Sequence, residues 1–132
     1  MITQIHQDMV PLVLAAGAIT LILGLVALYQ VRRAPAGAVP RSLTFFRRML
    51  AVTAAIGVLQ AIFGGILFLQ GCRPGDNLHF VYGLIVLGAV PVAYAYSDQK
   101  QVRRDIIIMS IAAVAIIGAA VRAWMTGSGV CP

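Results

Sequence analysis

The sequence contains no glutamate and very little charge of any kind. Only 11% of its 132 residues are charged and 61% are hydrophobic, whereas soluble domains carry roughly a quarter charged residues. A soluble domain of this length has too little interior to bury so much apolar surface. The composition therefore predicts a single domain, residues 1–132, that lies in a lipid bilayer.

Catalytic signatures are also missing. The sequence has no phosphate-binding glycine loop, no zinc-ligand spacing and no HExxH pattern. No Asp or Glu lies within an apolar stretch, although small proton-coupled multidrug transporters rely on a membrane-embedded glutamate. The net charge is +6, but the basic residues are not interleaved with polar or aromatic readers of nucleic acid. These absences argue against an enzyme, a small transporter and a nucleic-acid-binding protein.

Four apolar stretches are present instead, and each has the roughly 20 residues that a helix needs to cross a bilayer. They cover about residues 9–31, 49–69, 78–96 and 106–125. Residues 1–9 contain no Lys or Arg, so the first stretch lacks the positive region of a signal peptide and is predicted to be retained. The predicted fold is all-α, an up-down bundle of four transmembrane helices.

The basic residues predict the orientation of this bundle. Eight of the ten lie in the first and third connections, and the positive-inside rule places such connections in the cytoplasm. Both termini are then expected on the periplasmic side of a bacterial inner (plasma) membrane. The charged residues around the third connection, Asp98, Lys100, Arg103, Arg104 and Asp105, are expected to be solvated.

Small residues at four-residue spacing are typical of membrane helices that pack closely. The polar side chains Thr20, Thr53, Gln60 and Ser110 within these helices are expected to form hydrogen bonds between helices. Each stretch contains one stripe of small residues, namely Ala16/Thr20/Gly24, Gly57/Ala61/Gly65, Ala89/Ala93/Ser97 and Ala115/Ala119/Ala123.

Cys72 and Cys131 are the only cysteines, and each follows the end of an even-numbered stretch. Both are therefore expected at one membrane depth, on the oxidising side, where an even count predicts a disulfide. Two free thiols are the alternative. Quinone-linked disulfide oxidoreductases of four spans use a CxxC and a second cysteine pair, and this sequence has neither.

The two histidines, His6 and His79, are expected at the outer entrances of spans one and three, which lie diagonally in an up-down bundle. Two diagonal imidazoles would ligate a b-type haem, with Arg122 near enough in depth to pair with a propionate. This layout resembles one half of haem A synthase. In the alternative interpretation His6 is solvated, His79 belongs to a helix cap or an interfacial belt, and Arg122 extends to the lipid headgroups.

Two segments, LHFVYG at 78–83 and PVAYAYS at 91–97, resemble small four-span bacterial membrane proteins that accompany electron-transfer complexes such as alternative complex III. This resemblance implies membrane lipids and larger membrane subunits as partners. The first prediction is a non-catalytic accessory subunit of such a complex, without a cofactor. The alternative is an electron-transfer protein that binds haem b or quinone through His6, His79 and Arg122, and a small transporter is the second alternative.

Overall fold

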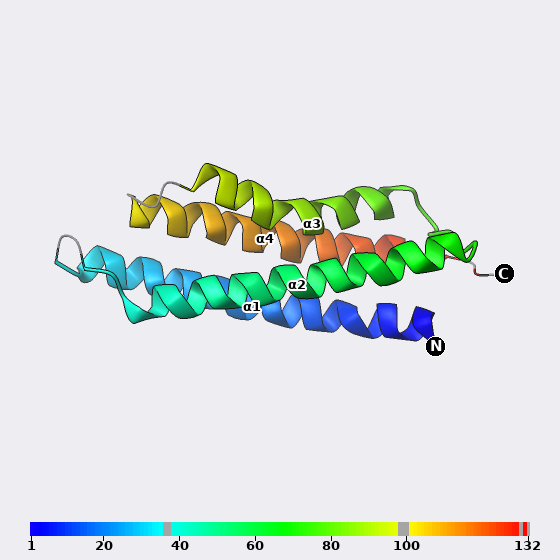
Figure 1. Cartoon of the computed structure of the whole chain (residues 1–132), viewed down its shortest axis with the longest axis horizontal. Coiled ribbons are helices and arrows are strands. Elements are labelled where there is room, and N and C mark those ends of the chain that lie inside the picture. The colour runs from blue at the N-terminus through cyan, green and yellow to red at the C-terminus, as the bar shows by residue number, and fades with distance from the viewer. Residues whose placement is uncertain (36–37, 98–100, 130, 132) are drawn as a thin grey trace.

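The computed structural model describes residues 1–35, 38–97, 101–129 and 131, which form an elongated bundle of four helices (Figure 1). The helices are α1 (Ile2–Arg33), α2 (Arg41–Leu69), α3 (Leu78–Tyr96) and α4 (Val102–Thr126). All four are long and apolar enough to cross a membrane. The predicted fold, an up-down bundle in a multi-pass membrane protein, is confirmed.

The bounds of three helices extend beyond the apolar stretches. α3 coincides with the predicted 78–96, but α1 begins at Ile2 rather than near residue 9, α2 at Arg41 and α4 at Val102. Hydropathy marks only the section that crosses the hydrocarbon, whereas backbone hydrogen bonding continues into the polar flanks. As a result, His6 lies inside α1 rather than in a segment before it.

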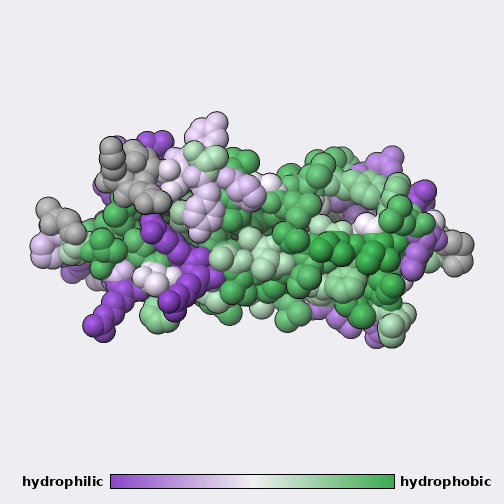
Figure 2. Space-filling model, in the orientation of Figure 1, coloured by the Kyte–Doolittle hydropathy of each residue, from purple (hydrophilic) through white to green (hydrophobic). Residues whose placement is uncertain are grey.

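Polar and apolar surfaces are segregated along the bundle (Figure 2). On the face shown, hydrophobic residues cover the middle, and hydrophilic residues gather towards the two ends. One end, called here the disulfide end, carries the start of α1, the end of α4 and Cys72–Cys131. The opposite, arginine-rich end carries Arg32, Arg33, Arg41, Arg47, Arg48, Arg103 and Arg104.

The four helices do not pack equally. α1 packs against α2 and α4, and α3 packs mainly against α4. The contact between the neighbours α2 and α3 is much sparser, and the described parts of α1 and α3 do not pack directly. α1 and α3 are therefore diagonal, and the α2–α3 side is the loosest part of the bundle.

Buried threonines join α1 to α2. The hydroxyls of Thr20 and Thr53 lie 2.9 Å apart within hydrogen-bond distance, and both side chains are fully buried. Each hydroxyl also lies within hydrogen-bond distance of the carbonyl four residues earlier in its own helix. The hydroxyl that donates to the other therefore shares its single proton between two acceptors. This confirms the interhelical bond predicted for these two residues.

The charged cluster expected to be solvated is in part buried, so that prediction is wrong for Asp105. Its side chain is 0% exposed, and its carboxylate lies 3.9 Å from the guanidinium of Arg47 in α2. Since α4 begins at Val102, Asp105 occupies its first turn, where the helix dipole favours a negative charge. Asp98 and Lys100 lie outside the described residues.

The disulfide between Cys72 and Cys131 is present, as predicted, with the two Cα atoms 4.2 Å apart. It holds the segment after α4 against the α2–α3 connection. A Cβ atom added at Gly129 would overlap the carbonyl oxygen of Arg73, and one at Gly75 would overlap that of Ser128. Backbone therefore lies directly on backbone at the disulfide end, where no larger residue fits.

Candidate functional site

A mostly apolar cavity of about 520 Å³ lies towards the disulfide end, and all four helices contribute to its wall. Its volume is within the range of about 300–1,000 Å³ that small-molecule and cofactor sites occupy. The wall is formed by His6, Val10 and Val13 of α1, Gly57, Gln60, Ala61, Gly64, Gly65 and Phe68 of α2, His79, Phe80, Gly83, Leu84, Val86 and Leu87 of α3, and Ala120 and Ala123 of α4.

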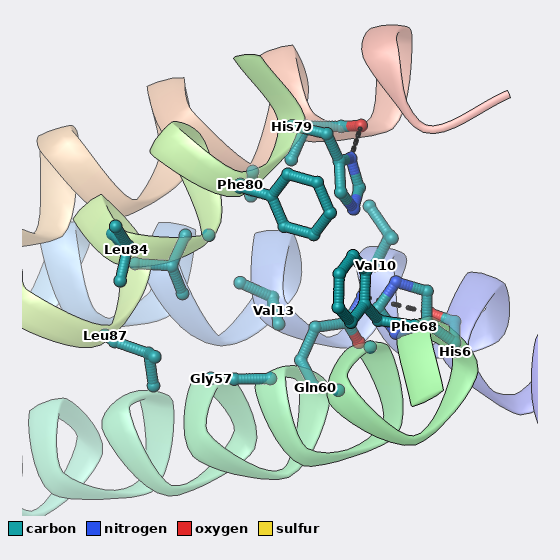
Figure 3. Close-up of a pocket in the computed structure, with 17 residues that line it drawn as sticks. His6, Val10, Val13, Gly57, Gln60, Phe68, His79, Phe80, Leu84 and Leu87 are labelled. Carbon is teal, nitrogen blue, oxygen red and sulfur yellow. Dashed lines mark hydrogen bonds between the residues drawn. The ribbon is translucent and has the colours of Figure 1, made fainter. Parts of the chain in front are cut away.

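Both histidines singled out in the sequence line this cavity. His6 projects from α1 and His79 from the diagonal helix α3, so that the two imidazoles lie at the same end of the cavity (Figure 3). Their ring centroids are 6.2 Å apart and their planes are inclined at 62°. Because α1 and α3 do not pack directly, the two rings approach each other across the space that these helices leave between them.

A hydrogen bond defines the tautomer of His79. Its Nδ1 atom lies 2.9 Å from the carbonyl oxygen of Ala123 in α4. A carbonyl can only accept, so Nδ1 carries the proton and, in the neutral ring, Nε2 is left with a free lone pair. This arrangement, with one ring nitrogen donating to a backbone carbonyl, is the usual way in which proteins orient a histidine that binds a metal.

His6 is held from its backbone. The side-chain amide of Gln60 in α2 donates a hydrogen bond of 3.0 Å to the carbonyl oxygen of His6, which confirms the predicted interhelical role of Gln60. Two buried atoms beside the cavity, Nδ1 of His6 and Oε1 of Gln60, have no hydrogen-bond partner among the described residues. Such atoms are costly to leave unpaired, so a polar or metal-bearing occupant would stabilise this end of the cavity.

Two glycines make room for the two imidazoles. A Cβ atom added at Gly64 would lie 3.2 Å from Cε1 of His6, and one at Gly127 would lie 3.1 Å from Cε1 of His79. Each ring therefore rests against backbone that has no side chain of its own. This role could not be recognised from the sequence, because glycine is frequent throughout membrane helices.

An aromatic pair forms part of the wall, and one exposed arginine lies beside it. Phe68 of α2 and Phe80 of α3 meet edge to face, with centroids 5.4 Å apart and planes at 88°. The guanidinium of Arg73 lies 4.1 Å from the centroid of Phe68 and donates hydrogen bonds to the carbonyls of Phe68 and Cys72. Arg73 thus places a positive charge beside the cavity, a role that its position in a short connection did not reveal.

Arg122, by contrast, is not brought into the cavity. Its side chain is exposed, and its guanidinium lies 5.8 Å from the ring centroid of Tyr82. It is not among the residues that line the wall. Of the three predicted cofactor-binding residues, the structure brings His6 and His79 together and leaves Arg122 on the surface.

The donor set restricts which metal group would fit. Within the described residues no third His, Cys, Asp or Glu joins the two histidines, whereas a bare zinc ion takes four ligands, at least three of them from protein. The iron of a haem is already held by four porphyrin nitrogens and needs only axial ligands from the protein. His6 and His79, with ring centroids 6.2 Å apart, are the residues that would hold such a group.

Comparison of the chain with models of protein families, with curated proteins and with solved structures gives no match. A function must therefore be inferred from the chemistry of the cavity.

Proposed function

We propose that this chain is a membrane-embedded electron-transfer protein that binds one b-type haem in its cavity, where His6 and His79 would hold it. The observation that carries the proposal is the pair of imidazoles, 6.2 Å apart, at one end of an apolar cavity of about 520 Å³. When bound, a haem supplies reversible one-electron oxidation and reduction.

The chain's own residues would position and shield such a group. The carbonyl of Ala123 keeps the proton of His79 on Nδ1, so that Nε2 is available as a ligand. Gln60 ties the backbone at His6 to α2 and limits its movement. Val10, Val13 and other apolar residues of the wall would exclude water from a bound haem.

The acid groups of a haem also require positive charge or water. Arg73 lies against Phe68, which is part of the cavity wall. Arg73 would supply positive charge for these acid groups at the disulfide end. In the orientation predicted by the positive-inside rule, this is the periplasmic side of the membrane.

A quinone is the second candidate, and one observation favours it. The buried Oε1 of Gln60 has no partner among the described residues, and a hydroquinone hydroxyl would donate to it. The lone pair on Nε2 of His79 would accept from the second hydroxyl. Membership of a larger electron-transfer complex is compatible with either ligand and stays a prediction.

The test is a reduced-minus-oxidised absorption spectrum of the protein, extracted in mild detergent from a host that makes haem b, recorded on the eluate of a size-exclusion column. A Soret band and an alpha band should elute with the chain. His6→Ala or His79→Ala should remove the six-coordinate spectrum, and Arg122→Gln should retain it. The haem proposal is wrong if the wild-type chain elutes without these bands, and quinone recovered in stoichiometric amount would then support the second candidate.

A further inference from the structure

The cavity wall on the α2–α3 side is made of side chains that are also exposed on the surface of the bundle. Phe68, Phe80 and Leu84 line the cavity, yet they are 42%, 40% and 67% exposed. Because the cavity is only partly enclosed, the exposure of these three side chains indicates that it reaches the surface on this side. Because the surface between two spanning helices faces acyl chains, this opening leads to lipid rather than to water.

Small residues keep the opening free. Gly65 of α2 and Gly83 of α3 both line the cavity, and a Cβ atom added at either would meet nothing within 4 Å. α2 and α3 are also the neighbouring helices with the sparsest contact. No side chain of the described residues fills the space at these two positions.

The disulfide end is closed in a different way. The segment after α4 is bonded through Cys131 to Cys72, and Gly129 lies directly on the backbone of Arg73. The same segment starts at Gly127, beside the ring of His79. A ligand coming from water on this side would have to displace a covalently held segment.

We propose that the ligand enters and leaves this cavity sideways, between α2 and α3, so that the bilayer itself is the source and the acceptor of the ligand. The edge-to-face pair of Phe68 and Phe80 joins the two helices beside the opening and acts as its gate. The inference rests on the proposed haem site. Haem is a largely apolar amphiphile, which makes the bilayer a suitable reservoir for it.

The experiment measures the rate of haem exchange. Haem-loaded protein is reconstituted in phosphatidylcholine–phosphatidylglycerol vesicles, mixed with an excess of haem-free vesicles and apomyoglobin, and followed through the Soret band. Gly65→Leu adds a side chain at the opening. Gly118→Leu is the matched control, since Gly118 also has nothing within 4 Å of an added Cβ but does not line the cavity.

Two further variants distinguish exchange between α2 and α3 from exchange through the disulfide end. Phe80→Ala removes the aromatic gate, and since such pairs contribute energies that correspond to about 2- to 10-fold in a rate, exchange should accelerate by that factor. Cys131→Ser releases the segment at the disulfide end and should leave the rate unchanged. Gly65→Leu should slow exchange, and Gly118→Leu should match the wild-type protein.

The opposite pattern overturns the lateral route. If Cys131→Ser accelerates exchange while Gly65→Leu and Phe80→Ala do not change it, the ligand passes through the disulfide end, and the haem site itself stands. If Gly65→Leu binds no haem, Phe80→Ala decides the question, because an unchanged rate in that variant contradicts the gate. A wild-type protein that binds no haem contradicts the proposed function before any rate is measured.

Discussion

The side chain of Gln60 in α2 donates a hydrogen bond of 3.0 Å to the backbone carbonyl of His6 in α1. This bond joins two helices. α1 carries the proposed iron-ligating residue His6, and α2 carries neither of the two ligating histidines. His79 is held by its ring instead, whose Nδ1 donates to the backbone carbonyl of Ala123 in α4. All four helices therefore take part in placing the two imidazoles, two by carrying them and two by holding them.

Gln60→Leu should lower the free energy of unfolding by about 0.6 kcal/mol, the average for hydrogen bonds between membrane helices. The loss is modest because the substitution also removes the buried Oε1 atom that has no partner among the described residues. Reversible unfolding in mixed detergent micelles measures it. The exposed Gln4 offers a matched control, Gln4→Leu, and equal stabilities of the two variants would show that the contact does not stabilise the bundle.

Loss of the disulfide should cost up to about 4 kcal/mol, the chain-entropy value for a closed loop of this length, since the two cysteines are 59 residues apart. Because both cysteines belong to one bond, Cys72→Ser, Cys131→Ser and the double variant should lose the same stability. Unfolding of all three variants, with intact-mass measurement of the wild-type protein before and after reduction, checks this. Losses that add in the double variant would mean that each thiol acts separately.

Thr20 and Thr53 should be energetically coupled, because their hydroxyls bond to each other in a buried position. The double-mutant cycle uses Thr20→Val and Thr53→Val, which keep the shape of the side chain. The coupling energy is expected to be about 0.6 kcal/mol. Strict additivity of the two substitutions would contradict the bond between α1 and α2.

Much of the fold was predictable, because a bilayer leaves few choices to an apolar chain. A spanning segment must satisfy its own backbone hydrogen bonds, so an apolar run of sufficient length predicts a helix directly. The limits of α3 follow from this alone, since its apolar run ends where the helix ends. The early start of α1 did not follow, because helicity outside the hydrocarbon depends on local hydrogen bonding that hydropathy does not measure.

The site was predictable only in part. The approach of His6 to His79 was predictable, because the depth of each residue in the membrane follows from the topology. The diagonal arrangement of α1 and α3 follows from it as well. Rotation of a helix about its own axis does not follow from topology. For this reason the sequence predicts Arg122 beside the cofactor, whereas its side chain lies on the surface, and predicts Gly65 in a helix-packing stripe, whereas it lines the cavity.

Gly64→Ala should alter the haem spectrum without unfolding the bundle. The added methyl group would lie 3.2 Å from Cε1 of His6, so the ring must move by a few tenths of an ångström and its bond to the iron should weaken. A change in axial ligation is read from the position and intensity of the Soret and alpha bands. Gly88→Ala in α3, where nothing lies within 4 Å, is the control and should leave both bands unchanged.

The most direct test of the central claim is near-infrared magnetic circular dichroism of the oxidised wild-type protein, because this spectrum identifies the two axial ligands of a haem iron. Ligation by two histidines is the expected result, and His79→Ala should abolish that signal. A haem that carries any other ligand pair, or a protein without haem when the host supplies it, would contradict the assignment of His6 and His79 as ligands.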